Sequence, residues 1–201
     1  MCAREISQPK YEIVGKLERF NEADNVQARG ELLPDSRLWK DYYEKHPELE
    51  NLGRAWSKLP GPGDTGPLED RLMVAAMHDT LSLLSKDEDL DGIPSPSKSI
   101  IHPSRASEKI KGLARHLGAD LVRVGPLNRA WVYSHVGRAY YPGKEIGAEI
   151  NLPHDSAIIV ATHLKLSKLR CAPELGSLTE IFQNYLQLAK IVVTLAKYIR
   201  L

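Results

Sequence analysis

Cysteine is scarce in this chain, which has only Cys2 and Cys171 among its 201 residues. A [4Fe–4S] cluster ordinarily takes four thiolate ligands, and a structural zinc site takes four ligands from Cys and His at short spacing. Two distant cysteines cannot supply either set, so we predict no metal site. Because the chain has no secretory features, we expect both cysteines to be free thiols.

Long apolar runs and an excess of one charge are also missing. No run of eighteen apolar residues occurs, and the first residues have neither an apolar signal-peptide core nor a twin arginine. We therefore expect no transmembrane segment and a cytoplasmic location. The 27 basic and 26 acidic residues are intermixed and give a net charge of +1, which does not favour nucleic acid as a partner.

Common catalytic and phosphate-binding motifs are absent too. There is no Gly-x-Ser-x-Gly elbow of the kind that carries a serine nucleophile. Gly61, Gly63 and Gly66 have the spacing of a dinucleotide loop, but prolines stand between them and no strand precedes them. Residues 86–92 begin like a calcium loop, yet Lys98 stands where the closing glutamate is needed. We therefore expect a turn-rich linker and an acidic surface loop.

The clearest pattern lies in residues 104–164. Apolar residues recur at helical spacing up to Leu117, and Gly118 then suits a helix C-terminal cap. Residues 121–127 have the character of a strand that ends at Pro126. Residues 155–162 form a near-continuous apolar run, typical of a strand buried on both faces of a sheet. These elements predict an α+β or α/β layer with a covered sheet.

Two further helices are predicted, over residues 67–85 and 177–201. The first places Leu68, Leu72 and Leu83 near one face. The second begins with Ser177 and Glu180 in the spacing of a capping box and carries a wide apolar stripe over about six turns. Such a stripe requires burial, because each exposed side chain of this size costs about 1.5–3 kcal/mol. We therefore suspect an incomplete folding unit.

The first 66 residues are charged and interrupted by prolines, so we expect an irregular arm followed by a helix/strand domain over 67–201. A short helix within 37–50 would carry Trp39, whose ring would pack on the protein body or line a channel. In the connector between the two strands, aromatic residues form a second group. Their rings suit a flat macrocycle or an apolar halogenated compound, and they suit a hydrophobic core equally well. These residues are Trp131, Tyr133, Tyr140 and Tyr141.

Three segments in the same order resemble the amino-terminal half of the reductive dehalogenases. They are "YEIVGKLERFNEADNVQARGEL" with "YYEKHPEL", then "ASEKIKGLARHLGADLVRVGPLNRAWVYS" with "EINLPHDSAIIVATHL", and "CAPELGSLTEIFQNYLQLAKIVVTLAKYIRL". The resemblance covers nearly all of the chain but only the front of the family.

The resemblance implies the front part of a nitroreductase-like, corrinoid-binding fold, in an oxidoreductase that removes halide from organohalides. It implies a cobalamin-type corrinoid held by Trp131 and Tyr133, and a substrate channel lined by Tyr140, Tyr141 and Trp39. Family members also hold 4Fe-4S clusters, whose ligands this chain lacks. No residue here can be given the catalytic role, so we expect the chain to be inactive alone and completed by a separate carboxy-terminal chain.

Two other classes of function remain open. The chain could be a stand-alone module that binds a corrinoid or a halogenated compound, or an interaction subunit that offers its last helix to a partner. The related corrinoid-dependent epoxyqueuosine reductases share only the general layout and need the same missing clusters.

Overall fold

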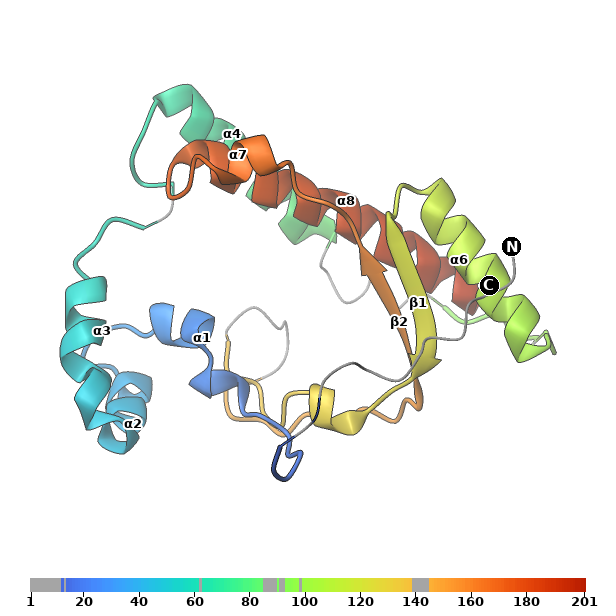
Figure 1. The fold of residues 1–201 in the computed structure, drawn as a ribbon, viewed down its shortest axis with the longest axis horizontal. Helices are drawn as coiled ribbons and strands as arrows, with labels where there is room; N and C mark the ends of the chain where they lie inside the picture. Colours follow the sequence, from blue (N-terminus) through green and yellow to red (C-terminus); the bar gives the residue numbers. More distant parts are fainter. Residues whose placement is uncertain are drawn as a thin grey trace. The chain divides into compact units, whose positions relative to one another are not determined.

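The computed structural model describes residues 12, 14–61, 63–84, 90, 93–97, 99–138 and 145–201. The chain divides into two compact units: Met1–Arg29 with Asn128–Pro153, and Gly30–Leu127 with His154–Leu201. Helices combined with one small antiparallel sheet confirm the α+β class. The predicted boundary at residue 66 and the nitroreductase-like fold stay predictions. Figure 1 labels the α-helices and strands, which are α1 (Val26–Gly30), α2 (Arg37–Lys45), α3 (Glu50–Trp56), α4 (Leu68–Leu84), α6 (Pro103–His116), β1 (Leu121–Pro126), β2 (Ser156–Ala161), α7 (Leu166–Leu169) and α8 (Leu175–Arg200). Short 3-10 helices are η1 (Glu22–Asp24), η2 (Pro47–Leu49) and η3 (Arg129–Trp131).

Helix α6 and strand β1 form where the sequence predicts them. Proline at position 103 suits the first helical turn, where its missing N–H is not needed. Gly118 ends the turn after the helix with a φ of +106°, a conformation that side chains disfavour. A Cβ at this position would also collide with the Gln187 side chain. The chain can therefore reverse from α6 into β1 within a few residues.

Strands β1 and β2 pair antiparallel, with Val122 opposite Val160 and Val124 opposite Ile158. Side chains alternate between the two faces of a strand, so these four residues share one face. That face packs on α6 and α8 around a core of Ala114, Val122, Ile191 and Leu195, all at most 3% exposed. Figure 1 shows α8 running behind the sheet.

The opposite face of the sheet is open, contrary to the prediction of a sheet covered on both faces. By the same register Leu121 lies opposite Ala161, Arg123 opposite Ile159 and Gly125 opposite Ala157. Leu121 is 62% exposed and Ile159 is 61% exposed. Among the described residues, the apolar run of β2 is therefore buried on only one of the two faces of the sheet.

Three polar side chains of α8, spaced about one helical turn apart, hydrogen-bond to the backbone of other segments of its unit. The Glu180 carboxylate accepts from the Lys165 amide (2.8 Å), Asn184 Nδ2 donates to the His163 carbonyl (2.9 Å), and Gln187 Nε2 donates to the Leu117 carbonyl (2.9 Å). The predicted capping box is wrong. Glu174 is the N-cap residue, Ser177 Oγ donates to the Glu174 carbonyl, and Glu180 is occupied by Lys165.

Helix α4 packs along α8, where the His78 ring meets Phe182 edge-on at 5.8 Å between centroids. Its buried residue is Val74, while the predicted apolar face of Leu68, Leu72 and Leu83 is more than half exposed. No helix in the described ranges is long and apolar enough to cross a membrane.

Helices α2 and α3 form a hairpin with its own small core. Ser36 caps α2 by accepting from the Trp39 amide (3.2 Å), as expected for a serine before a helix. Trp39, Tyr42 and Tyr43 are buried together, with the Trp39 and Tyr43 ring centroids 4.4 Å apart. The predicted short helix is thus confirmed, whereas α1 and α3 add regular structure that the irregular-arm prediction omitted.

Candidate functional site: an aromatic patch on a clamped connector

The connector after β1 is shaped by a short helical turn. Asn128 accepts from the Ala130 amide (3.0 Å) and so caps η3, which ends at Trp131. Residues 132–134 then run without regular structure. Within this stretch the Trp131 side chain is 64% exposed and that of Tyr133 is 38% exposed. Both predicted cofactor-binding residues are therefore accessible and close together in the sequence.

Arg19 holds this connector from a segment more than a hundred residues earlier. Its Nε donates to the Val132 carbonyl (3.2 Å), and Nη2 donates to the carbonyls of Tyr133 (2.5 Å) and Ile150. A guanidinium has five N–H donors in a fixed plane, so one side chain can satisfy several carbonyls at once. The Ser134 amide adds a bond to the Phe20 carbonyl (2.8 Å).

Glu22 makes a second contact between the amino-terminal segment and the connector after β1. Its side chain is 2% exposed, and one carboxylate oxygen accepts from the Gly137 amide (2.9 Å). Gly137 lies directly against the backbone of Glu22 and Ala23, where any Cβ would overlap main-chain atoms. Val136 beside it is 1% exposed. Glu22 and Arg19 together make one unit from residues 14–29 and 128–153.

We call the three exposed aromatic residues Phe20, Trp131 and Tyr133 the aromatic patch, in which Trp131 stands two residues before Tyr133. The Phe20 and Tyr133 rings lie 6.4 Å apart at a tilt of 50°, and Phe20 is half exposed. Asn25 Nδ2 donates weakly to the Tyr133 hydroxyl (3.4 Å), which leaves the hydroxyl proton available to a ligand. Exposed aromatic rings of this kind are suited to a wide apolar ligand.

Of the other predicted site residues, Tyr140 and Tyr141 lie outside the described residues. Trp39 belongs to the other unit and is 2% exposed, because Tyr43 packs on its ring and the Arg54 guanidinium lies 5.5 Å from the ring centroid. Its predicted place in a substrate channel stays a prediction, and the ring offers little surface to a ligand.

The residues present suit the two implied cofactors unequally. A corrin ring could lie against the aromatic patch, which offers exposed rings, two of them 6.4 Å apart between centroids. An iron–sulfur cluster does not fit, since the chain has two cysteines; Cys171 is a free thiol and Cys2 lies outside the described residues. Within the described ranges no group of three or more His, Cys, Asp or Glu side chains could hold a metal ion.

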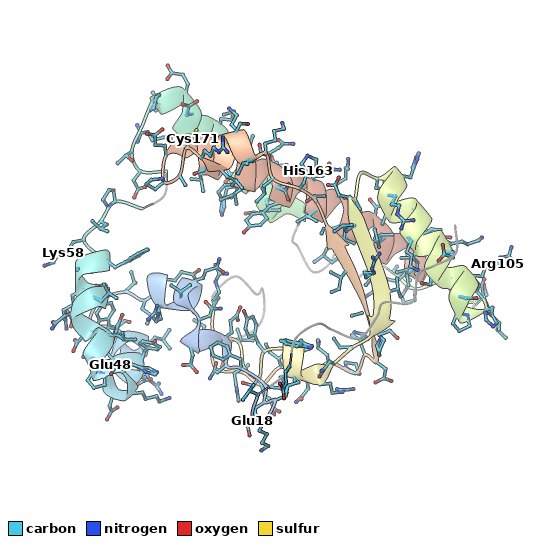
Figure 2. The ribbon with its side chains drawn as sticks, viewed as in Figure 1. Glu18, Glu48, Lys58, Arg105, His163 and Cys171 are labelled. Carbon is cyan, nitrogen blue, oxygen red and sulfur yellow. The ribbon has the colours of Figure 1, made fainter. Side chains whose placement is uncertain are left out.

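A second polar cluster lies at the far end of the sheet, where Figure 2 labels His163. Its Nδ1 and its backbone amide both contact Asp120 Oδ2 at 2.9 Å. The hydrogen bond from the imidazole, and to a smaller extent the one from the backbone amide, hold the pKa of Asp120 below its ordinary value. The pair joins the start of β1 to the segment after β2, as expected for the structural role predicted for His163.

Comparison with protein-family models gives no match, and no curated protein is significantly similar to the chain. The site is thus defined as an exposed aromatic patch on an α+β chain, without a family assignment from these comparisons. Sequence patterns did not reveal Arg19 or Glu22, because their partners lie 113 to 131 residues away. The one local signal is that both stand in the first segment that resembles the reductive dehalogenases.

Proposed function

We propose that this chain is the amino-terminal portion of a reductive dehalogenase and that its aromatic patch contacts the corrinoid. One observation carries the proposal. Residues 14–29 of the first resembling segment and the residues around WVYS belong to a single unit, in which Arg19 and Glu22 join them. Residues from two of the resembling segments therefore also carry the exposed aromatic side chains Phe20, Trp131 and Tyr133.

In this proposal the corrinoid supplies the reduced cobalt that takes the halide, and the protein supplies contacts and shape. Trp131 and Phe20 would give the macrocycle a dry contact surface, and the Tyr133 hydroxyl would donate to a polar group at its edge. The clamp by Arg19 would keep this surface in place before binding, so less ordering is needed when the ligand arrives. Electron delivery and proton donation belong to residues that this chain lacks.

Titration of the purified chain with cobalamin tests the proposal, followed by corrinoid absorbance and tryptophan fluorescence. We expect saturable binding that Trp131→Ala weakens about tenfold, since that substitution removes one large aromatic contact. Trp56→Ala is the matched control, because Trp56 is 60% exposed on α3 and carries no proposed role. Absence of saturable binding, or equal losses in both variants, would remove the support for a corrinoid contact.

Activity provides the second arm of the test. The chain with a corrinoid and a strong reductant should release no more halide from an organohalide than the corrinoid alone, since it cannot ligate a cluster. Halide release above that control would contradict the proposed inactivity.

A second candidate is an interaction subunit, and the exposed apolar residues of α8 favour it. Among the exposed apolar residues of α8 are Tyr185, Val192, Tyr198 and Ile199. A stand-alone binding module would instead show tight cobalamin binding by a monodisperse chain.

A further inference from the structure

The open face of the β1–β2 sheet has the composition of a covered surface with one charge at its centre. By strand register this face consists of Leu121, Arg123, Gly125, Ala157, Ile159 and Ala161. The two largest apolar residues are each more than 60% exposed. The three others without charge are Gly or Ala, which allow a neighbouring backbone to approach closely. Apolar sheet faces are normally buried against another layer.

Arg123 is the middle one of the three β1 residues on this face and lies opposite Ile159. Its Nη1 donates to the carbonyl of Val122 at 3.2 Å, and it forms no ion pair with any residue that the structure describes. A layer that covered Leu121 and Ile159 would remove Arg123 from water as well. A buried guanidinium requires a carboxylate or an equivalent acceptor to offset its desolvation.

The width of the face suits a single helix. Two strands lie about 4.8 Å apart, so the sheet presents a strip about as wide as one helix of 10–12 Å diameter. On the opposite face the sheet already packs on helices, with α6 against β1 and α8 against β2. A second copy of the chain fits poorly, because a two-fold symmetric contact would bring two Arg123 side chains together at its centre.

We propose that the open face binds an amphipathic helix of a partner whose apolar side carries one carboxylate, with Arg123 as the ion-pair partner. The sheet then becomes a middle layer between α8 and the incoming helix. This proposal does not depend on corrinoid binding by the aromatic patch, because the face lies in the unit of residues 30–127 and 154–201, outside the unit that carries the patch.

The test uses the full chain and a capped 18-residue helical peptide with a Leu/Ala face and a central Glu, together with versions that carry Gln or Lys there. We expect the Glu peptide to bind about tenfold more tightly than the Gln peptide, as for a hydrogen bond between charged groups, and the Lys peptide not to bind. Amide chemical-shift changes should map to residues 121–125 and 157–161.

Substitutions of Arg123 distinguish a specific ion pair from nonspecific apolar binding of the peptide. Arg123→Met should bind the Glu and Gln peptides equally, and Arg123→Glu should reverse the preference towards the Lys peptide. Arg105→Met, on the exposed surface of α6, is the matched control and should keep the original preference. Arg123→Gln replaces the Met variant if circular dichroism shows that the latter is unfolded. Equal affinities in the unsubstituted chain, shifts elsewhere, no binding at millimolar peptide, or self-association through this face would overturn the proposal.

Discussion

Arg19 joins three carbonyls that accept no hydrogen bond from a backbone amide of the described residues. Carbonyl groups in loops lack the ladder bonds of a strand, and a buried polar group without a partner costs about 1–3 kcal/mol. By donating to Val132, Tyr133 and Ile150, Arg19 fixes both sides of the connector that carries the aromatic patch. The shape of the patch therefore depends on a residue that does not belong to it.

Replacement of Arg19 by Met should destabilise the unit of residues 14–29 and 128–153 by about 3 kcal/mol, because charge-assisted bonds to carbonyls are lost. Hydrogen exchange at the Ser134 and Ile150 amides would measure it. Arg37→Met is the matched control, since the Arg37 side chain is 92% exposed, and it should change stability by less than about 0.5 kcal/mol. Unchanged exchange in Arg19→Met would contradict the role given to the clamp.

Asp120 should give a pH-dependent contribution to stability. Its pKa is lowered in the folded chain by the hydrogen bonds from His163, so the stabilisation is present above about pH 3.9, the unfolded value. It is lost as the pH falls through the lowered pKa. We expect Asp120→Asn to be less stable than the unsubstituted chain at pH 6 and equally stable near pH 2, by chemical denaturation. A difference that stays constant with pH would exclude this linkage.

The positions of helices and strands were predicted from the sequence more successfully than the caps at their ends and the elements that pack against them. Helical spacing located α4, α6 and α8, because burial repeats along a helix in a fixed period, and short apolar runs located β1 and β2. Ser177 and Glu180 match a capping box, but the partner of Glu180 is the backbone of Lys165, which only the folded chain brings near. The open sheet face was missed because an apolar strand looks the same whether its cover lies in this chain or elsewhere.

Functional residues were harder to predict than elements, because the sequence does not show which side chains the fold brings together. The aromatic patch could be located through Trp131 and Tyr133, which stand two residues apart in the sequence and are uncommon in type. Phe20 joins them only through the fold. Trp39 has the same residue type, yet it is enclosed by its own hairpin. An aromatic side chain thus predicts a large contact surface without indicating whether protein or ligand occupies it.

Two glycines within helices should respond oppositely to alanine. In Gly53→Ala of α3, the new Cβ would overlap the Tyr43 hydroxyl and press on the Trp39 ring, so we expect the α2–α3 hairpin to lose about 1–3 kcal/mol. In Gly112→Ala of α6, no atom lies within 4 Å of the new Cβ, so helix propensity should stabilise the chain by up to about 1 kcal/mol. Thermal unfolding of both variants distinguishes them, and destabilisation by Gly112→Ala would contradict the open site.

Core packing around α8 allows a second comparison between neighbours. Ile191 is fully buried, so Ile191→Ala should cost about 2–4 kcal/mol through lost contacts and the cavity left behind. The next residue, Val192, is 44% exposed, and Val192→Ala should cost less than about 1 kcal/mol. Urea denaturation measures both. Similar losses would mean that Val192 is covered in solution, as an interaction subunit requires.

The union of residues 14–29 with 128–153 also sets an order of events during synthesis. Ribosomes add about 5–20 residues each second, so the amino-terminal segment waits about 5–25 s before its partner segment has been made. During that interval the carboxylate of Glu22 and the guanidinium of Arg19 remain in water, and the α2–α3 hairpin can form first from local contacts. Residues 14–29 therefore reach their final place only after more than a hundred residues that follow them have been made.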